Sequence, residues 1–143
     1  MNKSRRTANL VSENNIFVDI TNDRVGVGKT NPSTKLDVDG VITCTDLNST
    51  SDIKLKTNFS SIDDPIGKVL QLNGVKFDWI DTKEPSIGVI AQELELVFPE
   101  LVRDIETHKT VNYHGIIAVL IEAIKEQQKQ INDFKLQIQN IKQ

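Results

Sequence analysis

The chain has 143 residues, of which 38% are hydrophobic, 26% charged and only 5% aromatic, and its formal net charge is −3. This length fits one domain, or one small domain with an arm, and the few aromatic residues predict a small core that oligomerisation completes. The acidic balance argues against a dedicated nucleic-acid binder, and a single cysteine with two histidines excludes an internal disulfide and a zinc finger.

The sequence predicts neither a membrane span nor a signal peptide. The longest clean apolar run, residues 116–121, is far too short to cross a bilayer. No apolar stretch follows the basic residues near the start of the chain. Because the chain begins without a helix cap or a strand signal, we expect it to be the end part of a longer protein.

Residues 1–50 have the pattern of a β-rich arm. Apolar, mostly β-branched residues alternate with polar residues or glycine in three short segments, and a turn signal, Asp39-Gly40, precedes the apolar pair at 41–42. Each strand is too short to bury a face alone, so we expect neighbouring copies of the chain to supply partners. The three segments are residues 16–21, 25–28 and 36–39.

Residues 51–113 are typical of a small α/β unit. Helical spacing of apolar residues, a proline in the first turn and a following Asn-Gly predict one helix, and Pro99 ends a second. Alternation of apolar and polar residues predicts the strands. The expected elements are a helix over 65–72, strands at 75–79 and 87–90, a helix over 91–98 and a hairpin over 102–113.

The strongest pattern lies in residues 114–143. Apolar residues recur there at alternating spacings of three and four for about four heptads, which is typical of a coiled-coil seam. Such a helix would be roughly 42 Å long, more than a core this small covers, so a helical partner is predicted. An amphipathic helix docked on its own domain is the alternative. The seam consists of Ile117, Leu120, Ile124, Gln127, Ile131, Phe134, Ile138 and Ile141.

The seam does not by itself fix the number of strands. Isoleucine occupies every first-type position, whereas the second-type positions are mixed. Isoleucine with leucine favours two strands, and isoleucine at both positions favours three or more. Gln127 would form one buried polar layer, which fixes register and lowers stability.

A serine and a lysine, Ser51 and Lys56, lie five residues apart where the arm meets the α/β unit. Serine is a weak nucleophile until a base removes its proton, and lysine is such a base only when burial or nearby charge favours its neutral amine. If Ser51 lies at a turn, a strand starting at Asp52 would fold Lys56 back toward it. On spacing alone, a polar linker followed by an edge strand with solvated lysines is the simpler interpretation.

Residues 51–58, Ser-Asp-Ile-Lys-Leu-Lys-Thr-Asn, resemble the opening signature of the peptidase S74 family. These are the C-terminal intramolecular chaperone domains of phage tail spikes, endosialidases and tail fibres. The arm, notably 24–28 and 31–38, is similar to the fibre shaft that usually precedes such domains. The resemblance continues in the family's order through residues 75–79, 87–93, 98–102, 111–113 and 120–126.

This resemblance implies a self-cleaving chaperone. Family members trimerise a β-rich fibre, help it fold and then cut themselves off with a serine–lysine dyad, whose residues map onto Ser51 and Lys56. The implied enzyme is a single-turnover serine endopeptidase that needs no cofactor and no metal. One departure is Lys54, where the family more often has arginine, because lysine does not reproduce a bidentate arginine–carboxylate contact.

The resemblance also implies where the chain acts and with what. Its partners would be further copies of itself, as a homotrimer, and the preceding shaft of the same polypeptide, with no nucleic acid and no membrane. It would be found in the host cytoplasm during assembly and on the virion's fibre or spike before release.

Ring geometry selects the bond to be cut. If Ser51 Oγ attacked its own carbonyl, a four-membered ring would be required. Attack on the Thr50 carbonyl passes through a five-membered ring and gives an ester that water can hydrolyse. We therefore predict cleavage between Thr50 and Ser51.

The other ionisable residues are weak candidates for a site. His108 and His114 have no partner at metal or triad spacing and are expected to be structural, and the lack of a histidine near Cys44 in sequence argues against a cysteine protease.

The expected fold is α+β: a short β-strand arm over 1–50, then a chaperone and autoprotease domain over 51–143 with a small α/β unit. Its long C-terminal helix, about 114–143, would lie in a trimeric coiled coil. A non-cleaving structural trimerisation tip of a fibre is the main alternative. A related domain of a eukaryotic membrane-bound transcription factor is another, against which the fibre-like arm and the lack of a span argue.

Overall fold

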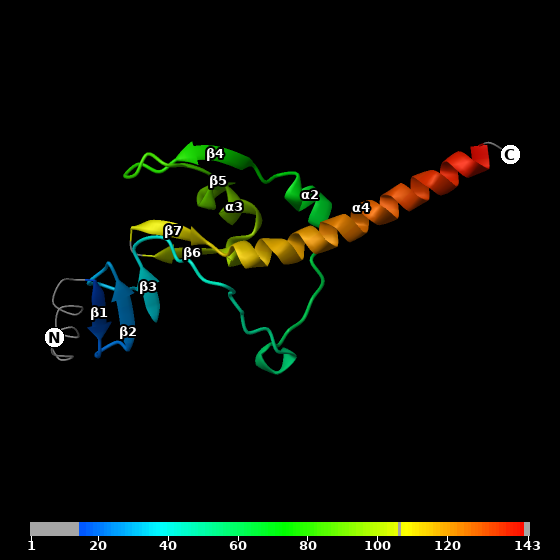
Figure 1. Ribbon diagram of the computed structural model, residues 1–143. Coiled ribbons are helices and arrows are strands. Elements are labelled where there is room, and N and C mark those ends of the chain that lie inside the picture. The colour runs from blue at the N-terminus through cyan, green and yellow to red at the C-terminus, as the bar shows by residue number, and fades with distance from the viewer. Residues whose placement is uncertain (1–14, 106, 142–143) are drawn as a thin grey trace. The chain divides into compact units, whose positions relative to one another are not determined.

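The computed structural model describes residues 15–105 and 107–141. They fall into two compact units, one that ends at Thr57 and one that begins at Asn58. Both are drawn in Figure 1, which shows small sheets, short helices and one long C-terminal helix. The predicted α+β class and the long terminal helix are therefore confirmed.

The first unit contains a three-stranded sheet in the order β1-β2-β3. Strands β1 (Ile16–Asp19) and β2 (Arg24–Val27) form an antiparallel hairpin, and β3 (Leu36–Val38) pairs with β2 in parallel. All three coincide with the predicted alternating segments. The apolar pair at 41–42 was expected to follow a turn, and it lies exposed and outside any strand.

The connection between β2 and β3 is short for a parallel crossover, which usually needs a helix. Side chains hold this connection in place of a helix. Arg24 donates a hydrogen bond to the Pro32 carbonyl at 2.9 Å, and the Pro32 side chain is fully buried. The Asp37 carboxylate accepts from the backbone N–H of Ser33 at 2.8 Å and from its hydroxyl at 2.7 Å, and pairs with Lys29 at 3.0 Å.

The second unit is built from two antiparallel hairpins and three α-helices. The Asp64 carboxylate caps the first helix by accepting from the Gly67 N–H at 3.1 Å, with Pro65 in the first turn. Its elements are α2 (Pro65–Val69), β4 (Gly74–Asp78), β5 (Pro85–Val89), α3 (Ala91–Val97), η2 (Pro99–Leu101), β6 (Val102–Ile105), β7 (His108–Val111) and α4 (Tyr113–Ile141).

These elements follow the sequence expectations closely, with two differences. The first helix ends at Val69 rather than near residue 72, and the short 3-10 turn η2 was not predicted. The long helix α4 runs over 29 residues, and the expected continuation to 142–143 lies outside the described residues. Among the described residues, no helix is long and apolar enough to cross a membrane.

The core of the second unit is small. Leu94 of α3 and Val119 of α4 belong to it, and Ala123, one helical turn after Val119, is also buried. α4 packs against α2 along its first half (Figure 1). A side chain at Gly115 would collide with Leu101, so glycine allows this close approach at the start of α4. The buried cluster consists of Leu94, Phe98, Leu101, Val102 and Val119.

Two leucines of α3 allow a matched test of this core. Leu94 is 1% exposed and Leu96 is 87% exposed. Leu94→Ala should lower the free energy of unfolding of the second unit by about 2–5 kcal/mol, because it leaves a cavity. Leu96→Ala should change it by less than about 0.5 kcal/mol. Urea denaturation of both variants makes the comparison, and equal losses would mean that the face of α3 that carries Leu96 is packed as well.

The arm allows a test of pH dependence. Hydrogen bonds from the Ser33 backbone and hydroxyl, and then the Lys29 contact, lower the pKa of Asp37 from 3.8 to about 2. Because the folded pKa is the lower one, this site stabilises the arm above about pH 4, and the contribution is lost as pH falls toward 2. In an NMR titration, Ser33→Ala should raise the pKa of Asp37 toward its usual value. Thr34→Ala should not, since the Thr34 hydroxyl donates to Leu36 instead.

Candidate functional site

A tight turn follows Ser51 at the end of the first unit. Its centre is the 3-10 turn η1 (Ile53–Leu55), which begins after Asp52 and ends before Lys56. The Leu55 N–H donates to the Asp52 carbonyl and the Lys56 N–H to the Ile53 carbonyl, both at 3.1 Å. The expected strand starting at Asp52 is therefore wrong, and a turn occupies its place.

The turn brings the ends of this segment together. Lys56 Nζ donates a hydrogen bond to Ser51 Oγ, with 2.6 Å between the two atoms. The predicted return of Lys56 toward Ser51 is thus present in the structure, by a different route. This contact is the one that a serine nucleophile and a lysine base require, because a proton can pass between atoms at this distance.

Both side chains of this pair are exposed in the single chain. The two atoms of a dyad are in contact, whereas the surroundings of the pair within the first unit are open to water.

Apolar side chains surround the turn without being covered. Ile53 is 70% exposed and Leu55 is 72% exposed, although both belong to η1 itself. Leu47, shortly before Ser51, is also exposed. Large apolar residues left in water are typical of a surface that another chain covers.

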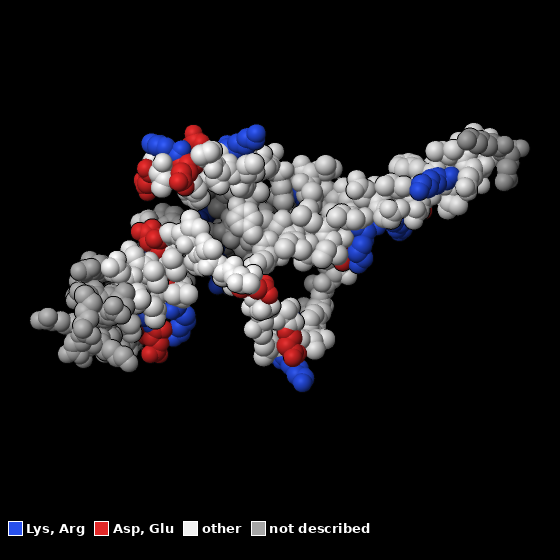
Figure 2. Space-filling view, in the orientation of Figure 1, with Lys and Arg blue, Asp and Glu red and all other residues white. Residues whose placement is uncertain are grey.

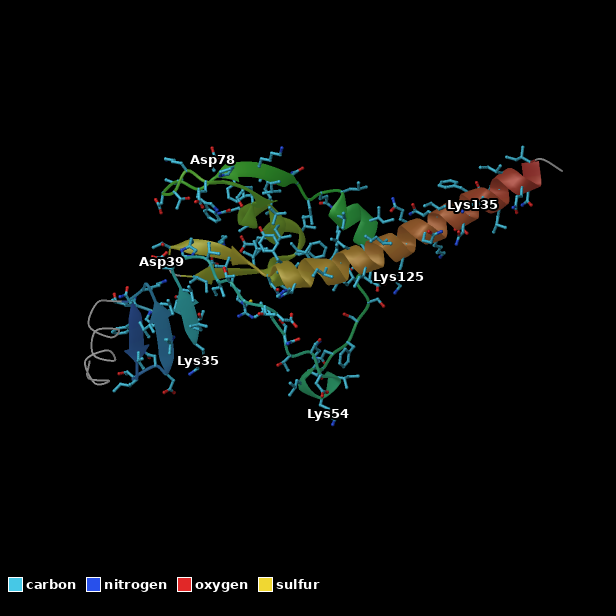
Figure 3. The ribbon with its side chains drawn as sticks, in the orientation of Figure 1. Lys35, Asp39, Lys54, Asp78, Lys125 and Lys135 are labelled. Atoms are coloured by element: carbon cyan, nitrogen blue, oxygen red, sulfur yellow. The ribbon has the colours of Figure 1, made fainter. Side chains whose placement is uncertain are left out.

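Lys54 lies on the opposite side of the same turn. Figure 3 shows its side chain at the outer end of the loop, pointing away from the ribbon. Its backbone N–H donates to the Asp52 carboxylate at 2.8 Å.

A second candidate surface runs along α4. Val119 and Ala123 bury one face of the helix, and the predicted seam lies on another face. Every apolar seam residue is exposed, by 41% at Ile131 up to 84% at Ile141, and Gln127 is exposed as well. The first half of α4 is thus docked on its own unit, as the alternative expected, whereas the seam residues are exposed.

The far half of α4 has no cover at all within the described chain. Every residue from 127 to 141 is exposed. Figure 2 shows a largely uncharged surface there, interrupted by lysine, and Figure 3 shows Lys125 and Lys135 projecting from the helix. By contrast, the β4–β5 hairpin carries acidic and basic side chains side by side.

Cys44 is a free, exposed thiol, and His108 begins β7 whereas His114 lies in the first turn of α4. Within residues 15–105 and 107–141, no group of three or more histidine, cysteine or acidic side chains is placed to hold a metal ion.

Sequence reasoning missed the role of Asp52. Aspartate is a common turn residue, because its carboxylate accepts a hydrogen bond from the backbone N–H two residues further along the chain. That signal was present in the printed sequence, and it would have predicted a turn in place of a strand.

Comparison with known proteins agrees with the family resemblance. Residues 51–103 match the model of the peptidase S74 family, which is described as the chaperone of endosialidase. The match begins at Ser51 and includes the turn, helices α2 and α3, the β4–β5 hairpin between them, and the start of β6. This match confirms the resemblance to the peptidase S74 family over residues 51–103.

Among curated proteins, the chain is similar to long tail fibre proteins of bacteriophages. It is 33% identical to the long tail fibre protein Gp37 of Salmonella phage S16, over 72% of this chain and 15% of that protein. It is 41% identical to Gp37 of Enterobacteria phage K3, over 52% of this chain and 7% of that protein. Gp37 of Enterobacteria phage T2 is also 41% identical, over 6% of its length. The chain thus corresponds to a small part of each relative.

Proposed function

We propose that residues 51–143 are an intramolecular chaperone that trimerises and helps to fold a phage tail fibre, then releases itself by cutting its own chain. The observation that carries the proposal is the hydrogen bond of 2.6 Å between Lys56 Nζ and Ser51 Oγ. It occurs at the first residue of the segment that matches the peptidase S74 family. Residues 1–50 would then be the end of the fibre shaft.

The chemistry follows from the two atoms. The amine of Lys56, once neutral, takes the proton of Ser51 Oγ, and the oxygen attacks the carbonyl carbon of Thr50. The bond between that carbon and the Ser51 nitrogen breaks, and the nitrogen receives the proton from Lys56. Water then hydrolyses the ester between the Thr50 carbonyl and Ser51 Oγ, which leaves a carboxylate on Thr50 and a new amino terminus at Ser51. Each chain is cut once.

The exposed seam of α4 supports assembly. An apolar stripe at heptad spacing is stable only when other helices cover it, and one face of α4 is already used by its own unit. Copies of the same chain are the partners that present the same stripe. A homotrimer suits a chaperone that is part of a fibre chain, because the chains of one fibre would have their C-terminal ends side by side.

Assembly also offers a means of switching the dyad on. In one chain Ser51 and Lys56 are exposed, and so are the apolar side chains of Ile53 and Leu55. A neighbouring copy that covers this apolar surface would remove water from Lys56, which favours its neutral, proton-accepting form. Cleavage then follows trimerisation, and the chaperone does not leave before the shaft has formed.

The location follows from the same proposal. The chain would act in the host cytoplasm during assembly and would be part of a virion fibre or spike until released. Its partners would be its own copies and the shaft of the same polypeptide, without nucleic acid, membrane, cofactor or metal.

A non-cleaving trimerisation tip remains the second candidate function. The exposure of Lys56 favours it, because a lysine base needs surroundings that exclude water. The two functions differ in the intact mass of freshly expressed protein, which is one species for a tip and two for a self-cleaving chain.

The dyad is tested by substitution. Ser51→Ala removes the nucleophile and Lys56→Ala the base, and both should leave a full-length, folded trimer. Lys56→Arg should also stay uncut, since arginine remains protonated. Lys54→Ala is the matched control: it removes a lysine of the same turn and should retain at least partial cleavage. Intact mass and N-terminal sequencing are the measurements, with Ser51 expected as the new terminus.

Each outcome of this series has one meaning. Normal processing in Ser51→Ala would refute the nucleophile. Processing in Lys56→Arg would remove lysine as the base while keeping the serine. A new terminus at Asp52 would rule out the five-membered ring and favour attack by a serine of a neighbouring chain.

The seam is tested by charge. Ile131→Asp with Ile138→Asp places like charges in the proposed seam, and sedimentation should then show monomers. Asn132→Asp with Gln139→Asp adds the same charges one residue further along the helix, off the seam, and should stay trimeric. The seam variant should also remain uncut on a denaturing gel, although its dyad is intact.

Two results would contradict this part of the proposal. A seam variant that stays trimeric would move the assembly contacts elsewhere. A monomeric variant that cleaves at the wild-type rate would separate cleavage from assembly.

A further inference from the structure

The backbone between Ser51 and Lys56 decides whether the two side chains can meet. In an extended strand, five residues span about 16 Å, and residues an odd number apart point to opposite faces. A lysine side chain does not bridge that distance from the wrong face. A 3-10 turn has three residues per turn and a rise of about 2 Å per residue, so it shortens the segment and rotates Lys56 back.

Such a turn is not stable by itself. It contains only the three residues Ile53–Leu55, none of which is buried, so packing does not hold it. Two backbone hydrogen bonds of 3.1 Å close it. A third bond, from the Lys54 N–H to the Asp52 carboxylate at 2.8 Å, satisfies a backbone donor that the turn leaves without a partner.

We propose that Asp52 is a positioning residue for the dyad. Its carboxylate caps the turn, and the capped turn holds Lys56 Nζ against Ser51 Oγ. The Asp52 carboxylate accepts from the Lys54 backbone N–H and not from Ser51 or Lys56 in the bonds described above. Asp52 therefore acts on the dyad through the backbone geometry of the turn. This inference rests on the proposed self-cleavage and adds the residue that sets its geometry.

A cap and a charge make different demands on this position. A cap requires an oxygen that accepts from the Lys54 N–H, and asparagine supplies one as well as aspartate does. If Asp52 acted through its negative charge, that charge would favour the protonated form of Lys56, and asparagine would remove it. The asparagine variant therefore separates the two roles.

The test compares single-turnover cleavage rates of full-length chains. Asp52→Ala should cut about five-fold more slowly than wild type, the effect expected for the loss of one N-cap. Asp52→Asn should restore the wild-type rate and leave the pH profile of cleavage unchanged. Asp46→Ala is the matched control, because Asp46 is also exposed and accepts from a backbone N–H, that of Leu47, at 2.8 Å but lies outside the turn.

A second measurement does not depend on cleavage. In the uncut Ser51→Ala background, hydrogen exchange at the Lys54 and Lys56 amides should be faster with Asp52→Ala and unchanged with Asp52→Asn. If wild type is not cut at all, the proposed function fails, and this measurement still decides whether Asp52 holds the turn.

The overturning results are specific. Wild-type cleavage by Asp52→Ala, or amide exchange unaffected by it, would mean that the turn needs no cap. Slow cleavage by Asp52→Asn, or a shifted pH profile, would assign Asp52 to charge and not to positioning.

Discussion

The small core of the second unit limits how much of α4 the chain can cover by itself. Val119 and Ala123 place one face of the helix against that core, and the hydrophobic cluster has only a few fully buried members. The stripe from Ile117 to Ile141 stays in water as a result. Burying an isoleucine side chain contributes about 1.5–3 kcal/mol. Burial of the exposed stripe by other chains would therefore stabilise the assembly considerably.

The same limit connects folding to chemistry in the proposed function. A lysine base needs a site from which water is excluded, and Ser51 and Lys56 are exposed in the single chain. In the proposed trimer, a neighbouring chain would cover Ile53 and Leu55, which are exposed as well. The proposed reaction would then be timed by assembly.

Periodic parts of this molecule could be predicted from sequence, and local or paired parts could not. Alternation placed β1, β2 and β3, and heptad spacing placed α4, since these patterns repeat over many residues. The turn η1 has three residues and no period, so only the Asp52 cap signal pointed to it. The parallel pairing of β2 with β3 was also out of reach. It depends on contacts such as the hydrogen bond from the Arg24 side chain to the Pro32 carbonyl, which alternation does not encode.

For the candidate site, the sequence identified the residues but not the conformation of the backbone between them. Ser51 and Lys56 were identified by resemblance, and their contact of 2.6 Å is what a dyad needs. Spacing alone had favoured a polar linker, because five residues in a strand would have kept the two apart. The site was therefore recognisable by residue type and order, whereas its geometry depends on one short turn.

Gln127 gives the proposed seam a means of fixing register. It is the one polar member of a stripe otherwise made of isoleucine, leucine and phenylalanine, and it is exposed in the single chain. In a trimer aligned in register, the three amides meet and can bond to one another, because each has both donors and an acceptor. A shift by one heptad would place the amide against Leu120 or Phe134, and each buried amide without a partner costs about 1–3 kcal/mol. In the proposed trimer, register matters because each dyad would be covered by a neighbouring copy, which must be aligned with it. A polar layer at Gln127 would lower the stability of the seam slightly. It would also disfavour misaligned trimers, in which the dyads would stay uncovered.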